Sequence, residues 1–489
     1  MWLALVSLAF AAPARPCGTP ELLKVAPPLA RQAPALPAGN RAAGKAMRDA
    51  FGLENHMQTA NFAVHWASQT PAQHVLDDLA AAFETAWAEQ IGRMEHDAPL
   101  GTDTYLFNVY IGDSGEGSPD GFGAGGYYYV DSEGQPMIVI AWDSLFYAQS
   151  LSSTAYHEFY HAIQGRADRY PYEDPSAWYW EATAEWAAIE TEPLNPSNGA
   201  FAFGYLLLPQ LPVNFFDYAD TGIIQEYHQY GAFLFAHDLT EQVGWELVRD
   251  TWMDSGTEED PLEVMRAWLA DRDLDLDELY LDHLAHNAVY DYEMGAAYRE
   301  SVEFFNEWYY PDLDRVAIAL GDEGGSGRAL KAIAPHRYGA TMIAVSWPID
   351  GTLDVTVTGD AEGTEGSPAR YGARVVQQWN DGTHAYTDVV FDGVTGTVTM
   401  PLEGTEEVVW LVVGAWTETW DGAVWAEEAF PFDYAITVTP PLEPPGLPYL
   451  PTEKEGPTSG SDCNCDSRGG GGGAWVAGLA ALLLLRRRV

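Results

Sequence analysis

Residues 157–161 read His157-Glu158-Phe159-Tyr160-His161, and residues 180–186 read Trp180-Glu181-Ala182-Thr183-Ala184-Glu185-Trp186. On a helix, two histidines four positions apart lie on one face, one turn from each other. Such a pair suits a single zinc ion, with Glu158 beside it as a general base. Glu181 and Glu185 share one face of a second helix. We expect the two helices to cross, so that both imidazoles and the carboxylate of Glu181 converge.

The apolar surroundings of Glu158 favour a bound cation. Between Asp143 and Arg166 it is the only charged side chain, histidines aside, although 20% of the chain is charged. A carboxylate in an apolar helix is costly unless hydrogen bonds or a cation compensate it, and a metal ion with its water would do so. The alternative interpretation is a buried helix with two hydrogen-bonded core histidines.

Both helices have recognisable ends. Residues 152–154, Ser-Ser-Thr, can cap the first helix, and Gly165 follows its last apolar residue as a left-handed stop. The second helix is predicted to begin with Asp174 as its cap and Pro175 in its first turn. Two histidines and a glutamate, with an open fourth position for water, are typical of catalytic rather than structural zinc.

The two motifs resemble those of gluzincins, the thermolysin-like zinc peptidases, and most of all the peptidase MA-like branch and the secreted metalloproteases of myxobacteria. The resemblance covers residues 154–190. It implies a zincin-like fold in which His157, His161 and Glu181 bind zinc and Glu158 is the base. Glu185 would orient a ligand histidine, although this position is Glu where the family has an acidic residue that is usually Asp.

The predicted function is that of a secreted, surface-associated zinc metallopeptidase, a hydrolase of peptide bonds. Zinc lowers the pKa of a bound water, and Glu158 takes its proton as the water attacks the peptide carbonyl. Two alternatives stay open. The first is a catalytically inactive surface adhesin on a zincin scaffold. The second is a zinc amidase that acts on cell-wall or glycan substrates.

A helix predicted from Glu226 to Gly244 supplies candidates for a further catalytic role. Its Tyr, Gly and apolar pattern resembles the helix that follows the metal site in peptidase MA-like proteins. Amide hydrolysis builds negative charge on the carbonyl oxygen, which a phenol or an imidazole can stabilise. Tyr230 is the first candidate and His228 the second, against the alternative that both only pack.

The chain is predicted to be α+β, with a zincin-like metallopeptidase domain of mixed sheet and helices followed by an antiparallel β-sandwich. The predicted segments are a signal peptide (1–14), a linker or short pro-segment (15–54), the metallopeptidase domain (55–311), the accessory β-sandwich (312–440), a Pro/Glu-rich spacer (441–462) and a C-terminal sorting tail (463–489). The 489 residues, 47% of them hydrophobic, supply ample core for two or three domains.

Alternation and spacing predict the elements of the first domain. Strands are expected at 61–66, 104–111 and 136–142, and helices at 71–94 behind a Thr70 cap, 245–252, 261–270 and 276–287. In zincins the strand before the metal helix commonly holds extended substrate. Met137 to Trp142 occupies that place, where substrate could pair with an exposed edge.

Three polar stretches in this domain are given structural interpretations. Asp113–Gly126 is a mobile surface connection, with Ca²⁺ binding as the alternative. Asp271–Asp277 caps a helix, because Leu276 stands where a calcium loop requires glycine. His283 and His286, with no matching acidic partner, belong to a solvated face.

Short strands separated by Gly, Asp and Pro predict the β-sandwich. They are expected at 316–320, 340–347, 353–358, 374–379, 386–391, 396–400, 408–413 and 434–438. No set of catalytic residue types stands out among them, so an accessory binding or shielding role is expected.

The two ends of the sequence predict export. Trp2–Ala12 resembles a signal-peptide core, and Cys17 follows Pro16 rather than a small residue, so no lipid anchor is predicted. Cys463-Asn464-Cys465, a glycine run, an apolar stretch and three arginines resemble the sorting tail of myxobacterial surface proteins. This tail implies a sorting protease acting near Cys463 or Cys465, membrane contact through the tail alone, and display on the cell surface or release after processing. The net charge of −48 argues against a nucleic-acid partner.

Overall fold

The structure is a computed structural model. It describes residues 17, 45–122, 125–172, 175–195, 197, 199–216, 223–253, 256, 260–308, 315–330, 332–361, 368–417 and 429–440. The predicted signal peptide (1–14), the spacer (441–462) and the sorting tail with Cys463 and Cys465 lie outside these residues, as do Asp174 and most of the linker. Among the described helices, none has both the length and the apolar character that crossing a membrane requires.

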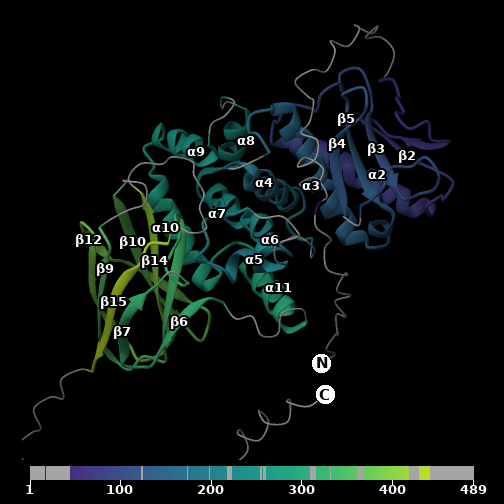
Figure 1. The fold of residues 1–489 in the computed structure, drawn as a ribbon. Coiled ribbons are helices and arrows are strands. Elements are labelled where there is room, and N and C mark those ends of the chain that lie inside the picture. Colours follow the sequence, from purple (N-terminus) through teal and green to yellow (C-terminus); the bar gives the residue numbers. More distant parts are fainter. Residues whose placement is uncertain are drawn as a thin grey trace, which may run out of the picture. The chain divides into compact units, whose positions relative to one another are not determined.

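The α+β class is confirmed, since helices and several sheets occur together (Figure 1). The first sheet has the order β1-β2-β3-β5-β4. Its strands are β1 (Asn55–Gln58), β2 (Phe62–Trp66), β3 (Phe107–Gly112), β4 (Gly126–Val130) and β5 (Pro136–Ala141). Strands β2, β3 and β5 are parallel, while β1 and β4 run antiparallel to their neighbours.

The expected substrate-binding edge at Met137–Trp142 is wrong. Strand β5 pairs with β3 on one side and β4 on the other, and its residues are buried, so it offers no free edge. The edge strand is β4, which the sequence did not predict because Gly-Tyr-Tyr-Tyr-Val lacks alternation and follows a glycine-rich loop. Residues 45–54, assigned to the linker, also contact this part of the chain, since the Ala46 amide donates to the Thr104 carbonyl at 3.0 Å.

Helix α2 (Gln73–Ala86) packs on the helix that carries the histidines and continues as a wider π-helical segment, η2 (Trp87–Arg93). Its buried Leu76, Leu79 and Phe83 recur every three or four residues, as the predicted helix 71–94 requires. Thr70 is not its cap, because the Thr70 hydroxyl accepts a hydrogen bond from the Trp66 indole instead.

The two motif helices are α3 (Ala148–Ala167) and α4 (Ala177–Thr191), and they contact each other. Figure 1 shows α3 beside β4 and β5, on which it packs. Helix α3 begins ahead of the predicted caps at 152–154, and its left-handed end is Asp168, with φ 47°, rather than Gly165. Gly165 serves close packing instead, since a Cβ there would lie 2.2 Å from the Tyr128 hydroxyl of β4.

Seven further helices and one short turn complete this half of the chain as described. They are η3 (Trp142–Phe146), α5 (Ala202–Leu206), α6 (Ile223–Gly231), α7 (Phe233–Val243), α8 (Glu246–Met253), α9 (Pro261–Ala270), α10 (Leu276–Val289) and α11 (Gly295–Trp308). The single helix predicted from Glu226 to Gly244 is in fact two helices that meet at Ala232. The capping interpretation of Asp271–Asp277 is confirmed, because Asp275 accepts a hydrogen bond from the Asp277 amide at the start of α10.

The solvated face expected for His283 and His286 is wrong. The Nδ1 atoms of both rings lie 3.0 Å from the carboxylate of Asp238 on α7, and His283 is fully buried. Burial raises the pKa of Asp238, but its bonds to the two histidines outweigh this effect and hold it below its usual range. The acidic partner was missed because it is distant in sequence.

Residues 317–439 form two five-stranded sheets, with the orders β11-β10-β14-β8-β6 and β12-β13-β9-β15-β7. Their strands are β6 (Ala317–Leu320), β7 (Gly324–Ala329), β8 (Gly339–Ser346), β9 (Gly351–Gly359), β10 (Ala369–Trp379), β11 (His384–Asp388), β12 (Val390–Asp392), β13 (Thr395–Leu402), β14 (Glu406–Thr417) and β15 (Phe432–Thr439). Buried residues of both sheets form one apolar core.

The strands differ from the sequence prediction in three ways. The β6–β8 pair is parallel, so the expectation of wholly antiparallel sheets is wrong at this position. The predicted strand 386–391 is divided between β11 and β12. Strand β7, Gly-Gly-Ser-Gly-Arg-Ala, was missed because it has no apolar alternation. The predicted domain boundary at 312 falls in residues 309–314, outside the described part of the chain.

His237 on α7 predicts a pH-dependent contribution to stability. This buried ring lies 3.4 Å from Glu190 Oε1 and 3.0 Å from Glu241 Oε1. Burial lowers the pKa of His237, but the two carboxylates outweigh this and raise it to about 9. Because this pKa exceeds the unfolded value of about 6.5, the contribution, roughly 3 kcal/mol, is complete below pH ~6.5 and is lost as pH rises through about 9.

We therefore expect His237→Gln to reduce the unfolding free energy near pH 6 and to leave it nearly unchanged above pH ~9.5. Denaturant unfolding of the native chain and the variant at both pH values measures the difference. A destabilisation of equal size at both pH values would contradict the ionic role.

Candidate metal centre

Helices α3 and α4 bring His157, His161 and Glu181 together. The Nε2 atoms of the two histidines lie 3.0 Å apart, and Glu181 Oε2 lies 3.3 Å from that of His157 and 3.6 Å from that of His161. All three side chains are buried, with Glu181 and His161 at 0% exposure. The i, i+4 spacing on α3 stacks the two rings one turn apart, and the contact of α4 with α3 supplies the carboxylate.

Gln164 fixes the tautomer of His161. Its amide nitrogen donates to the carbonyl of Trp180 at 2.8 Å and to the Thr183 hydroxyl at 2.9 Å, so its Oε1 is the acceptor that faces His161 Nδ1 at 2.6 Å. His161 Nδ1 must therefore carry the proton, which leaves the lone pair on Nε2. Gln164 was not predicted, although its position three residues after His161, on the same helical face, could have suggested it.

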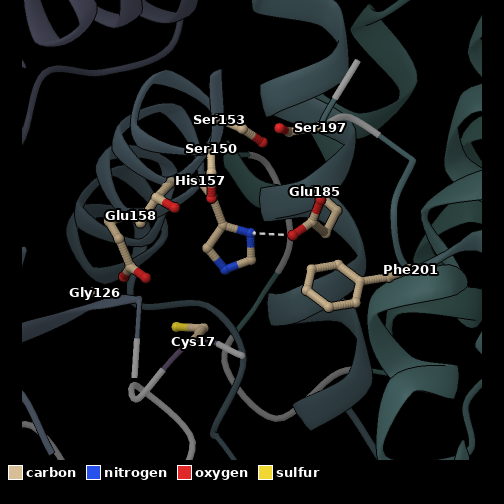
Figure 2. Close-up of a pocket in the computed structure, with 10 residues that line it drawn as sticks. Cys17, Gly126, Ser150, Ser153, His157, Glu158, Glu185, Ser197 and Phe201 are labelled. Atoms are coloured by element: carbon tan, nitrogen blue, oxygen red, sulfur yellow. Dashed lines mark ion pairs between the residues drawn. The ribbon is translucent and has the colours of Figure 1, made fainter. Parts of the chain in front are cut away.

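Glu185 is the acidic group that lies beside the Nδ1 atom of His157. Its Oε1 lies 3.0 Å from His157 Nδ1 (Figure 2). An acceptor oxygen lies within 3.0 Å of each Nδ1 atom, and the two Nε2 atoms face each other and Glu181 Oε2. A proton can bridge only one pair of these three atoms, whereas a metal ion accepts a lone pair from each. The arrangement therefore fits a cation better than a hydrogen bond.

Tyr172 holds the carboxylate of Glu181, the third candidate ligand, in place. Its hydroxyl donates to Glu181 Oε1 at 2.7 Å, which leaves Oε2 directed at the two rings. Burial raises the pKa of Glu181, but the imidazoles of His161 and His157 outweigh burial and lower it to about 2. The low pKa leaves the carboxylate of Glu181 ionised at neutral pH. The role of Tyr172 was not predicted, because it comes from the connection ahead of α4 rather than from either motif.

Cys17 is a fourth member of the cluster that the sequence did not predict. Its Sγ lies 3.5 Å from His161 Nε2, and one donor atom from each of Cys17, His157, His161 and Glu181 lies within 4.8 Å of the others. For ligand bonds of about 2.0–2.3 Å, a tetrahedral zinc ion sets its donor atoms about 3.3–3.6 Å apart. Four of the six separations, at 3.0–3.6 Å, are close to these values, and all six are within 4.8 Å.

Glu158 lies beside the cluster and lines a small pocket. The pocket is lined by Cys17, Gly126, Ser150, Ser153, Thr154, His157, Glu158, Glu185, Ser197 and Phe201 (Figure 2). Burial raises the pKa of Glu158. Gly126 at the start of β4 makes room for it, since a Cβ there would lie 3.1 Å from Glu158 Cγ.

Of the two predicted stabilising residues, the structure brings only Tyr230 to the cluster. Its ring centroid lies 6.2 Å from that of His157, and its hydroxyl donates to the Cys17 carbonyl at 3.5 Å. His228 packs instead against Tyr205 and Phe215, with ring centroids 5.0 and 5.5 Å away. Burial lowers its pKa to about 3, so His228 is a neutral core residue.

In the polar loop before β4, predicted at Asp113–Gly126, aspartate side chains accept hydrogen bonds from backbone amides of the loop itself. Asp113 Oδ2 accepts from the Gly121 amide at 3.0 Å, and Asp120 Oδ1 accepts from the Phe122 amide at 2.7 Å. Within the described part of the chain, the only group of three or more metal-ligand side chains in reach of one another is the one at His157. Ca²⁺ binding by this loop stays an untested alternative.

Removing the acceptor for His161 should weaken metal binding. We expect Gln164→Leu to lower the affinity for zinc about 10- to 100-fold, because Nδ1 loses the partner that fixes the ring and its tautomer. Competition with a chromogenic chelator measures the affinity. Gln242→Leu, at an exposed glutamine of α7, is the matched control and should bind zinc like the native chain. Equal affinities for all three chains would contradict the role of Gln164.

The fold and the cluster define an α+β protein with a candidate mononuclear metal centre. The chain belongs to the family of unknown function DUF6055, whose model matches residues 33–442. No curated protein matches the chain.

Two solved structures resemble the chain only weakly. The match to the pre-peptidase C-terminal domain of a collagenase from Bacillus anthracis spans 25% of this chain and 94% of that domain's chain, at 10% identity and a TM-score of 0.17. The match to a family GH115 4-O-methyl-α-glucuronidase with specificity for decorated arabinogalactans spans 60% of this chain and 39% of that enzyme's chain, at 11% identity and a TM-score of 0.14. Neither likeness carries an argument about this protein.

Proposed function

We propose that this protein is a zinc-dependent metallopeptidase that hydrolyses peptide bonds. The observation that carries the proposal is the convergence of His157 Nε2, His161 Nε2 and Glu181 Oε2, with an acceptor oxygen within 3.0 Å of each Nδ1 atom. Two histidines and one carboxylate are the ligand set of catalytic zinc in hydrolases. Glu158, adjacent to His157 in the chain, supplies a base that a structural zinc site does not need.

The chemistry divides between the ion and the chain. Bound zinc would polarise the substrate carbonyl and lower the pKa of the attacking water. Glu158 accepts the proton of that water and then delivers it to the departing amine. The Tyr230 hydroxyl, near His157, donates to the oxygen of the substrate carbonyl as negative charge develops there.

The surrounding fold is consistent with a zincin-like domain. The motif helices pack on a mixed sheet whose antiparallel edge strand, β4, places Gly126 in the pocket. An extended peptide that added to this edge would pass beside Glu158. The two sheets of residues 317–439 are proposed as the accessory β-sandwich, and we retain the proposal that the protein is exported and displayed or released through its C-terminal tail.

Glu158 also bears on the alternatives. A scaffold that served only as an adhesin would have no use for a buried carboxylate at 1% exposure in the pocket beside the ligands. A zinc amidase acting on cell-wall or glycan amides would use the same residues. Because the ligand set is shared, only the substrate distinguishes this alternative from a peptidase.

Elemental analysis and a cleavage assay together test the proposal. Because the Cys17 thiol lies in the cluster, both the native chain and Cys17→Ala are measured. We expect about one zinc per chain and, at least in the variant, hydrolysis of unfolded casein that a chelator stops and zinc restores. A chain without zinc would overturn the proposed function. Zinc-dependent hydrolysis of amide bonds in peptidoglycan fragments, without hydrolysis of casein, would favour the amidase.

A further inference from the structure

We infer that Cys17 is a fourth metal ligand, supplied by the N-terminal segment, and that its thiolate keeps the centre closed to substrate until the segment is cleaved. This inference rests on the proposed function, because it requires the metal. It assigns the regulation of the same site, in which a catalytic ligand set of three is completed from within the chain.

The position of the thiol carries the inference. Cys17 Sγ lies 3.5 Å from His161 Nε2. For a zinc–sulfur bond of about 2.3 Å and a zinc–nitrogen bond of about 2.0 Å, a tetrahedral ion sets these two atoms about 3.5 Å apart. The sulfur thus completes the group formed by His157, His161 and Glu181. A thiolate in the fourth position takes the place that a catalytic site keeps for water.

Cys17 also lies among the groups that would act on substrate. It lines the same pocket as Glu158 and Gly126, and Figure 2 shows it on the side of the His157 ring away from Glu185. The hydroxyl of Tyr230 donates to its main-chain carbonyl at 3.5 Å. Cys17 therefore engages the ligands, the base and the proposed oxyanion donor together. A peptide substrate could not reach these groups while Cys17 stays in place.

The sequence between Cys17 and Ala46 offers sites at which cleavage would release Cys17. The chain is fixed to the first sheet at Ala46, which pairs with Tyr105 and exchanges hydrogen bonds with Thr104 and Leu106. Lys24, Arg31 and Arg41 lie between Cys17 and this anchor. Cleavage at any of them separates Cys17 from the body and leaves the anchor intact. On release the thiolate takes up a proton and water fills the fourth position, so the step needs no oxidant or reductant.

A cobalt-substituted chain tests the ligand directly. The background is Cys463→Ala/Cys465→Ala, in which Cys17 is the only thiol of the chain. We expect about one Co²⁺ per chain, with the near-ultraviolet charge-transfer absorption of a cobalt–thiolate bond. Adding Cys17→Ala should abolish this absorption and retain the cobalt, and Cys17→Ser, which keeps the size of the side chain, should do the same.

Two further measurements test closure. A maleimide should label Cys17 slowly in the zinc-loaded background chain and quickly after chelation. The zinc-loaded Cys17→Ala chain should hydrolyse casein at least about tenfold faster than the background chain, since only the fraction of chains with an open site is active. Limited trypsin cleavage between Cys17 and Ala46 should raise the background chain to the same rate.

The outcomes separate the inference from the proposed function. Bound cobalt without the thiolate absorption would overturn the inference and leave the proposed function standing. Thiolate absorption with equal rates for the background and Cys17→Ala chains would overturn closure. Failure of every chain to bind cobalt or zinc would overturn the proposed function, and the inference with it.

Discussion

Glu158→Gln is expected to bind as much zinc as its parent chain and to hydrolyse casein about 100- to 10,000-fold more slowly. Glutamine keeps the shape of the side chain in its buried position beside Gly126, but its amide cannot accept the proton of the attacking water. The comparison belongs in the Cys17→Ala background, where the thiol cannot occupy the site. Initial rates at saturating zinc and elemental analysis of the same preparations measure the two properties.

Glu303→Gln is the matched control for this substitution. Glu303 is an exposed residue of α11, so its replacement by glutamine should change neither rate nor metal content. A Glu158→Gln chain as active as its parent would show that another group takes the proton. Loss of zinc from Glu158→Gln alone would instead make Glu158 a ligand rather than a base.

The helices and the faces that carry the candidate metal ligands could be predicted because they depend on local spacing. His157 and His161 share a face wherever residues 157–161 are helical, and the same holds for Glu181 and Glu185 four positions apart. The turns were less certain for a physical reason. Gly165 has the residue type of a left-handed stop, yet it makes space for Tyr128, a contact with a strand that local spacing does not specify.

The parts that could not be predicted depend on contacts between distant segments. Cys17 reaches His161 across 144 positions, and neither motif indicates its presence. Tyr172 acquires its role only when α4 presents Glu181 to it. Asp238 binds His283 through the packing of α7 on α10. Strand β4 was missed because three successive tyrosines fit no amphipathic period, and its place at the sheet edge depends on β5.

Removing one ligand histidine should abolish metal binding and its effect on stability. In the Cys17→Ala background, His161→Ala leaves only His157 and Glu181 as ligands. We expect its zinc content after dialysis to fall below about one tenth of the parent's, because two protein ligands do not hold zinc in sites of this kind. Zinc at about 1,000 times its dissociation constant stabilises the parent by about 4 kcal/mol, a gain that the variant loses.

Zinc is also expected to raise the thermal stability of the parent chain, because its charge compensates the buried carboxylates. Glu181 at 0% exposure and Glu158 at 1% are two buried carboxylates, and a bound metal would offset part of the cost of burying their charges. Added zinc should therefore raise the Tm of the parent by several degrees and leave that of His161→Ala unchanged. His74→Ala, at an exposed histidine of α2, controls for loss of an imidazole and should respond like the parent. If His161→Ala kept both its zinc and the rise in Tm, the ion would be bound elsewhere in the chain, and His157 and Glu181 would lose their assigned role as well.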